Sequence, residues 1–411
     1  MKMSRLLALA LSAAALPSHA QTTTASTLSC DRSYGLRADA NNVTGQTVCD
    51  AKVTAFLDAL QNFNLSNAAY TQTSSALVLG RFSDVNIIMS YNANSAVLSY
   101  NFVELGEKGS FAGGTRPASQ QQFADFVKKS DIIGRIMRYQ ADHSISSPIT
   151  GIGGAIPMAG EADFATAFDT LSHVAAGPAD STGSNNQVGI GIGYGSYSVS
   201  GSADRVRTST IPLSYTIRND IDPRRQLVFS LPLTLVQIGD ANSVHGGLGA
   251  AYRLPINDNW TLTPGGKYSV VASRDRATLS TIMSASLMST YAITLPGYAI
   301  AIGNMVGYYK TGKFSSGDYA FDPNIALTMT RNGIMSSLPT TLFGPKMATE
   351  VSFIDTRYLG NKPFLASTQE LGITVGTNRN AGNVRSFFRA GLSYLRGKDT
   401  RGFAANLGYW F

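Results

Sequence analysis

The sequence predicts an all-β transmembrane antiparallel β-barrel of about twelve strands, preceded by a small α+β N-terminal domain. Three observations lead to this prediction. From residue 187 onward, apolar side chains alternate with Gly, Ser, Thr or Asn in one strand-length run after another. Charged residues make up only 14% of the chain and gather between these runs. The last run is an apolar strand with no polar tail after it.

The first twenty residues have the composition of a secretory signal peptide. Basic residues precede an apolar stretch that is too short to cross a bilayer, and small side chains stand at a cleavage position after Ala20. We therefore expect the protein to be exported. In an oxidising compartment, Cys30 and Cys49, the only cysteines, are expected to form a disulfide rather than a metal site.

Residues 21–185 are predicted to form the exported α+β domain and a linker. Helical spacing of apolar residues predicts helices at 50–63, with Asp50 as N-cap, at 120–139 and at 161–176. Two alternating runs at 85–91 and 96–102, separated by a turn, predict a hairpin. The clearest boundary in the chain is the Gly- and Ser-rich stretch 177–186, so the barrel is expected to span 187–411.

The faces of the strands distinguish a membrane barrel from a soluble sandwich. A soluble sandwich carries Lys and Glu on its outer faces, whereas the non-apolar faces here hold mostly small, weakly polar residues. Aromatic residues lie near strand ends, where an interfacial girdle requires them: Tyr215, Tyr252, Trp260, Tyr291, Tyr298 and Tyr394. Closing the sheet also removes its exposed edges. We therefore expect the apolar faces to contact lipid.

The last strand carries Phe403, Leu407, Tyr409 and Phe411 on one face. This alternation, which ends in a C-terminal Phe, is similar to the sorting signal that the outer-membrane barrel assembly machinery reads in bacterial barrels. Its physical meaning is strand addition, in which an extended segment pairs with a sheet edge and alternate side chains give specificity.

Two further segments resemble the translocator domains of autotransporters. Residues 254–264 (LPINDNWTLTP) are similar to a short periplasmic turn of that family, and residues 355–360 (DTRYLG), leading to 370–373 (ELGI), are similar to its penultimate region. With only about 165 residues before the barrel, the chain looks most like solitary autotransporter-type barrels that lack a large passenger.

This resemblance implies a protein of the outer membrane of a Gram-negative bacterium, whose partners are outer-membrane lipid and the assembly machinery. It also implies that a helix before the first strand threads the pore, and 161–176 is the segment in that place. The alternative is that this helix packs on the core of the N-terminal domain. The loops at 311–324 and 356–368 are expected to face outside, counting back from a periplasmic C-terminus.

Three functions remain open at this point. The leading hypothesis is a non-enzymatic barrel that anchors or displays the N-terminal domain. The alternative is a porin-like channel for small solutes, in which the inward charges Glu350, Glu370 and Arg389 set ion preference. These charges either tune a pore or hold a plug helix, or they pair with one another to satisfy their burial. The least favoured is a lipid-modifying enzyme, because Ser243 and His245 are predicted to face the lumen rather than lipid.

No cofactor, metal or nucleic acid is expected. His143, His173 and His245 have no Cys or carboxylate partners at ligand spacing. The formal net charge of +7 includes Lys2 and Arg5 of the signal peptide, and no basic face with interleaved aromatic residues is present.

Overall fold

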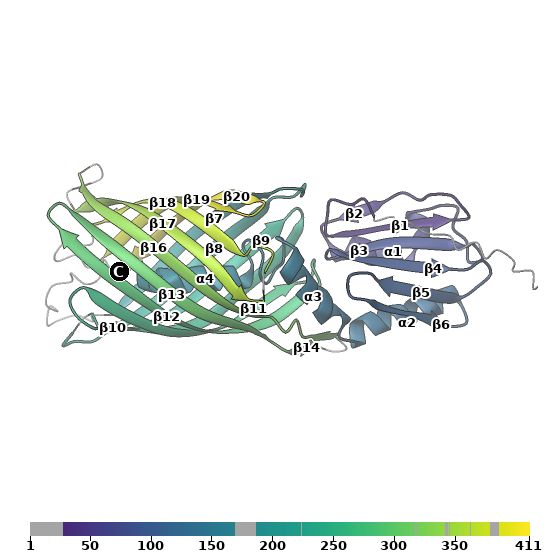
Figure 1. Ribbon diagram of the computed structural model, residues 1–411, viewed down its shortest axis with the longest axis horizontal. Helices are drawn as coiled ribbons and strands as arrows, with labels where there is room; N and C mark the ends of the chain where they lie inside the picture. Colours follow the sequence, from purple (N-terminus) through teal and green to yellow (C-terminus); the bar gives the residue numbers. More distant parts are fainter. Residues whose placement is uncertain are drawn as a thin grey trace, which may run out of the picture.

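The structure is a computed structural model that describes residues 28–168 and 186–411, except 223, 317–318, 342–343, 345, 362 and 379–385. Within these residues the chain forms an N-terminal α+β domain and a closed barrel, which lie end to end (Figure 1). The predicted signal peptide lies outside the described residues. The predicted fold class is confirmed, including the number of barrel strands.

The N-terminal domain is a six-stranded antiparallel sheet in the order β2-β1-β3-β4-β5-β6. Its strands are β1 (Tyr34–Ala40), β2 (Val48–Asp50), β3 (Ala76–Phe82), β4 (Val85–Tyr91), β5 (Val97–Phe102) and β6 (Glu107–Ala112). Its helices are α1 (Val53–Gln61), η1 (Phe63–Leu65), α2 (Arg116–Lys129) and α3 (Ile132–His143). Alternate residues of β4 are fully buried and pack into one core with α1 and α2. The predicted hairpin is confirmed as β4 and β5.

Two predicted helices need correction. Lys52, not Asp50, is the N-cap of α1; Asp50 ends β2, and its carboxylate accepts a hydrogen bond from the Lys52 backbone N–H at 2.7 Å. The stretch predicted as one helix at 120–139 is two helices. The helical conformation is interrupted at Ser130, whose backbone is extended. This interruption allows α3 to turn from the domain toward the barrel (Figure 1).

The barrel closes in the order β10-β11-β12-β13-β16-β17-β18-β19-β20-β7-β8-β9. The first six of its strands along the chain are β7 (Gln187–Val199), β8 (Val206–Arg218), β9 (Gln226–Ile238), β10 (Ala241–Pro255), β11 (Trp260–Ser273) and β12 (Thr278–Leu295). The other six are β13 (Tyr298–Gly312), β16 (Ala326–Thr340), β17 (Met347–Gly360), β18 (Ser367–Thr377), β19 (Phe387–Gly397) and β20 (Thr400–Trp410). The short strands β14 (Phe314–Ser316) and β15 (Tyr319–Phe321) form a hairpin between β13 and β16.

The exterior of the barrel is apolar around its circumference. Exposed large hydrophobic side chains occur on every barrel strand, among them Ile192, Leu248, Leu371, Leu392 and Phe403. A closed antiparallel barrel has no sheet edges, so its backbone groups are hydrogen-bonded between strands. Exposing an apolar exterior to water is unfavourable, so this surface is the lipid-facing surface of an outer-membrane barrel. No helix among the described residues has the length and apolar content needed to cross a membrane.

The two ends of the barrel differ. The N-terminal domain lies over the end that carries the β7–β8, β11–β12 and β13–β16 connections, and it contacts all three. The C-terminus lies at the opposite end (Figure 1). Of the two loops predicted to be long, the one after β13 spans 313–325, but β17 extends to Gly360 and shortens the other to 361–366.

Candidate functional site

The barrel lumen contains a helix, α4 (Ala155–Phe168), which packs against β10, β11, β12, β13 and β16. It begins six residues before the predicted start at 161, and the predicted part at 169–176 lies outside the described residues. Pro157 lies in its first turn, where backbone N–H groups have no acceptor within the helix. The N–H that proline lacks therefore costs no helical hydrogen bond.

Close packing of α4 requires glycine on the facing strands. A Cβ on Gly303 would lie 2.5 Å from the Phe168 ring, and one on Gly333 would lie 2.9 Å from the Phe164 ring. Both phenylalanines are buried, and they join one apolar cluster with Met305 of β13. The helix is therefore seated against one wall of the lumen.

Charged groups on the barrel wall also hold α4. The Lys267 ammonium lies 2.7 Å from the Asp163 carboxylate and donates to the Ala159 carbonyl at 3.2 Å. The Tyr309 hydroxyl donates to the same carboxylate at 2.9 Å. At the far end of the helix, Arg253 donates to the Thr166 carbonyl. These bonds connect α4 to three different strands.

The three inward charges named from the sequence lie in the lumen, and each forms an ion pair with an opposite charge two strands away. Arg389 forms an ion pair with Glu350, and both are buried. Glu370 accepts two hydrogen bonds from the Arg331 guanidinium, at 2.8 and 2.9 Å. Arg331 also lies over the ring of Phe164, 5.3 Å from its centroid, and so connects this pair to α4. Sequence reasoning missed Arg331, Lys267 and Arg253, because no residue near them in sequence reveals their partners.

The mouth under the N-terminal domain is packed. A cluster of apolar side chains from the segment after α3, the strand ends and the β17–β18 loop closes it: Ile145, Ile152, Tyr197, Val206, Val236, Ile238, Leu365 and Leu395. The Val53 backbone N–H donates to the Asp275 carbonyl at 2.7 Å, which joins the start of α1 to the β11–β12 turn. This end of the lumen therefore has an apolar seal.

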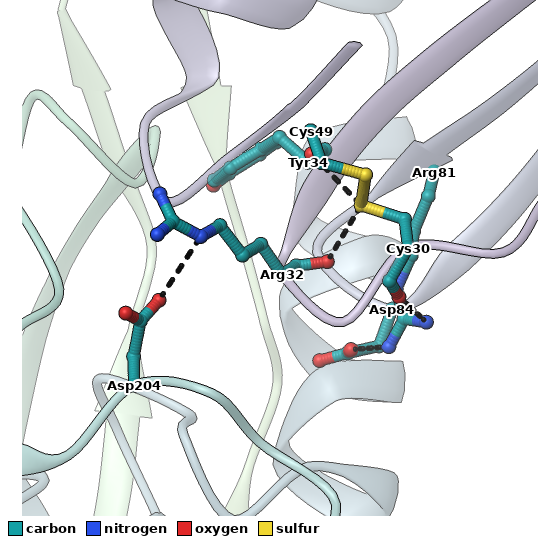
Figure 2. Close-up of a disulfide and its surroundings, with 7 residues drawn as sticks. All are labelled: Cys30, Arg32, Tyr34, Cys49, Arg81, Asp84 and Asp204. Carbon is teal, nitrogen blue, oxygen red and sulfur yellow. Dashed lines mark hydrogen bonds and ion pairs between the residues drawn. A yellow bond between two sulfur atoms is a disulfide. The ribbon is translucent and has the colours of Figure 1, made fainter. Parts of the chain in front are cut away.

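The disulfide lies at this junction (Figure 2). The predicted bond between Cys30 and Cys49 is confirmed. Two residues beyond Cys30, Arg32 forms an ion pair with Asp204 of the β7–β8 turn at 3.7 Å. Arg276 of the β11–β12 turn is almost completely buried and donates to the Ser33 and Ser146 hydroxyls, and this burial lowers the pKa of its guanidinium.

A cavity of 390 Å³ remains in the lumen, between α4 and the wall opposite it. It is lined by α4 and by inward residues of β7, β8, β9, β19 and β20, including Pro212, Pro232 and Trp410. Its volume lies in the range of small-molecule pockets.

Ser243 and His245 both face inward and are buried. The His245 Nε2 lies 3.1 Å from the Gly153 carbonyl oxygen, which can only accept, so this nitrogen carries the proton and holds the turn before α4. Within the described part of the chain, no cluster of three or more His, Cys, Asp or Glu side chains could hold a metal ion. His173 lies outside that part.

The last strand, β20, closes the barrel by pairing with β7. Beyond its end, Phe411 exchanges two backbone hydrogen bonds with Val188, at 2.9 and 3.0 Å. Phe403, Leu407, Tyr409 and Phe411 all face outward and are 42 to 66% exposed. The alternation seen in the sequence is therefore a lipid-facing stripe on the closing strand.

No protein-family model matches the chain, and no curated protein matches its sequence. Solved structures with a similar barrel include the β domain of the Bordetella autotransporter BrkA, at 13% identity and a TM-score of 0.42, covering 55% of this chain and 99% of that one. The translocator domain of the autotransporter NalP from Neisseria meningitidis shows 15% identity and a TM-score of 0.42, covering 62% and 98%. An outer membrane channel from Pseudomonas putida F1 shows 13% identity and a TM-score of 0.39, covering 57% and 97%.

Proposed function

We propose that this protein is an autotransporter-type barrel that anchors its N-terminal domain in the outer membrane and presents it at the cell surface, with no chemistry of its own. The observation that carries the proposal is the path of the chain. The N-terminal domain lies at one mouth, α4 lies inside the lumen, and β7 begins at the other end, where the C-terminus also lies.

The orientation follows from the route of insertion. A chain that reaches the outer membrane from the periplasm can leave the start of β7 and the C-terminus there without moving either end across the membrane. The opposite mouth, with the N-terminal domain over it, then faces outside. The ion pairs and hydrogen bonds from α4 to the wall support a helix that stays in the lumen as an anchor.

Labelling of intact cells tests this orientation. Because the native cysteines form a disulfide, a single introduced cysteine is the thiol that the labelling reagent detects. We choose Ser110→Cys in the exposed strand β6 and, as matched control, Ile221→Cys in the β8–β9 turn, where the side chain is 95% exposed. A membrane-impermeant maleimide should label Ser110→Cys on intact cells and should reach Ile221→Cys only after the outer membrane is permeabilised. The reverse pattern would place the N-terminal domain in the periplasm.

A channel for small solutes is the second candidate, favoured by the cavity beside α4. The apolar seal at the mouth predicts that the intact protein does not conduct, whereas deletion of 145–168 should open the barrel. Stepwise single-channel currents from the intact protein in a planar bilayer would favour the channel function over display of the N-terminal domain. A lipid-modifying enzyme would instead show phospholipid hydrolysis that His245→Ala abolishes, and the inward position of His245 argues against it.

A further inference from the structure

The ladders that join the β8–β9 hairpin to the strands on both sides of it are each interrupted once. Pro212 and Pro232 are register partners across the hairpin, and each is the seventh residue of a 13-residue strand. A proline has no N–H, so it removes a ladder hydrogen bond and rarely lies in the middle of a sheet. Here two prolines lie opposite each other at mid-height of the wall.

The two outer ladders of the hairpin are interrupted at these prolines. Between β7 and β8 the pairing runs to Ile190 with Leu213 and resumes at Gly193 with Thr210, so Pro212 lies in the gap. Between β10 and β9 it runs to Gly246 with Leu233 and resumes at Gly249 with Ser230, so Pro232 lies in the gap. We call these two gaps the seams.

The hairpin itself is continuous. Its pairing register has no gap from Val206 with Ile238 to Arg218 with Gln226, and the Thr210 and Thr234 hydroxyls are hydrogen-bonded at 3.0 Å. The described strands of the barrel have one further interruption, at Pro264 between β10 and β11. The β8–β9 hairpin is therefore a unit bounded by two weakened ladders.

An apolar groove of 640 Å³ lies on the outer surface over this part of the wall. Outward side chains form its sides, among them Tyr215, Phe229, Leu248 and Tyr268, and Gly189, Gly249, Ala250 and Gly266 form its floor. Because the groove opens from the lipid-facing surface, the molecule that meets it is a lipid chain.

The groove and the lumen cavity share wall residues. Gly189, Ser214, Ser230 and Lys267 line both of them. Three of these side chains are small or absent, so little material separates the two spaces. The outer space faces hydrocarbon, and the inner space is closed at the mouth by the apolar seal.

We propose that the seams form a lateral portal, through which one acyl chain of a membrane phospholipid passes from the outer groove into the lumen cavity beside α4. The missing ladder bonds lower the cost of separating the hairpin from its neighbours. The groove supplies an apolar path to that point. This proposal does not depend on which way the N-terminal domain faces, and its test is separate from the labelling test of display.

The two tryptophans of the chain give an inner and an outer reporter. Trp410 lines the lumen cavity, packed over Gly189 and Gly408. Trp260 stands at the start of β11 and donates to the Ser289 hydroxyl. Trp260→Phe leaves the inner reporter, and Trp410→Phe leaves the outer one. Each full-length variant is reconstituted in phosphatidylcholine vesicles whose acyl chains carry bromine, which quenches indole fluorescence on contact.

Two engineered disulfides close the portal. A Cβ on Gly193 would lie 3.7 Å from the Thr210 Cβ, which matches disulfide geometry of about 3.8 Å. The pair Gly193→Cys and Thr210→Cys therefore locks one seam, and Gly249→Cys with Ser230→Cys, also register partners, locks the other. The unlocked parent, treated with the same oxidant and reductant, controls for the native disulfide.

We expect brominated lipid to quench Trp410 in the unlocked protein, and oxidation of both locks to remove this quenching reversibly. Pro212→Ala with Pro232→Ala should weaken it, because both N–H groups are restored, while Pro264→Ala should leave it unchanged. Quenching of Trp260 should stay constant throughout. The proposal fails if bromine does not quench Trp410 in the unlocked protein, or if quenching persists with both seams locked.

Discussion

Removing the guanidinium of Arg331 should destabilise the barrel more than removing any exposed arginine. The Arg331 side chain is 6% exposed and that of its partner Glu370 is 13% exposed. Besides its two bonds to Glu370, Arg331 donates to the Thr356 hydroxyl at 2.7 Å. The variant Arg331→Ala leaves the Glu370 carboxylate without its counter-ion in a site that water hardly reaches.

Breaking a buried ion pair by removing one partner typically costs about 3 to 5 kcal/mol. The lumen beside Arg331 contains a cavity, so some water can reach Glu370, and we expect a loss near the lower figure, about 3 kcal/mol. Contact with the Phe164 ring adds on the order of 1 kcal/mol. The matched control is Arg357→Ala, whose partner is Asp355 and whose side chain is 67% exposed; it should cost less than about 1 kcal/mol.

The assay is a denaturant titration in detergent micelles, read by the different electrophoretic mobilities of folded and unfolded barrel. Replacing both partners, with Arg331→Met and Glu370→Met, should recover most of the loss, because neither member of this pair then keeps a charge. Equal costs for Arg331→Ala and Arg357→Ala would refute the reasoning, and so would a double variant that is less stable than Arg331→Ala.

Three further predictions concern other parts of the molecule. Replacing Cys30 and Cys49 by Ser opens a loop with a sequence separation of 19 and should lower the free energy of unfolding of the N-terminal domain by about 3 kcal/mol, measured by urea-dependent proteolysis. Burial raises the pKa of Tyr34 from its ordinary value of 10 to about 12. The neutral phenol therefore makes its full contribution to the free energy of unfolding below pH 10, and this contribution is lost as the pH rises to 12. This loss is about 3 kcal/mol by the same assay, and Tyr34→Phe should remove that part of the slope. Phe411→Ser should reduce the amount of folded barrel recovered from outer membranes without changing the stability of barrel that has folded, whereas Phe388→Ser, an outward change on β19, should not reduce assembly.

The barrel could be predicted from the sequence because its two faces meet different surroundings. Lipid outside and a crowded lumen inside impose a period of two on the side chains, and the barrel strands follow it. Strand β3 gave no such signal. The adjacent β3 residues Val78 and Leu79 point to opposite faces of the sheet, and both are buried. In the sequence β3 is therefore a continuous apolar run without alternation.

The arrangement of the lumen could be predicted only in part. Alternation alone places Glu350, Glu370 and Arg389 on inward faces. Which groups they pair with depends on the register of strands that are far apart in sequence. Arg331 and Glu370 are 39 residues apart and lie two strands from each other. Similarly, no local pattern indicates that Lys267 meets Asp163, 104 residues away.

The sequence pattern of α4 is weak, because the lumen is not a uniform solvent for it. An amphipathic stripe marks a helix that lies between a core and water. One side of α4 meets glycines and methionines of the wall, and the other meets Lys267, Arg253 and the cavity. The helix itself consists mostly of small and apolar residues, and its acidic residue Asp163 is paired with a lysine and accepts a hydrogen bond from a tyrosine. A helix with this composition would be poorly stable in water, and its stability here depends on a lumen that supplies both kinds of partner. The lumen wall and the helix are therefore expected to tolerate substitutions only in matched pairs, such as Lys267→Met with Asp163→Leu.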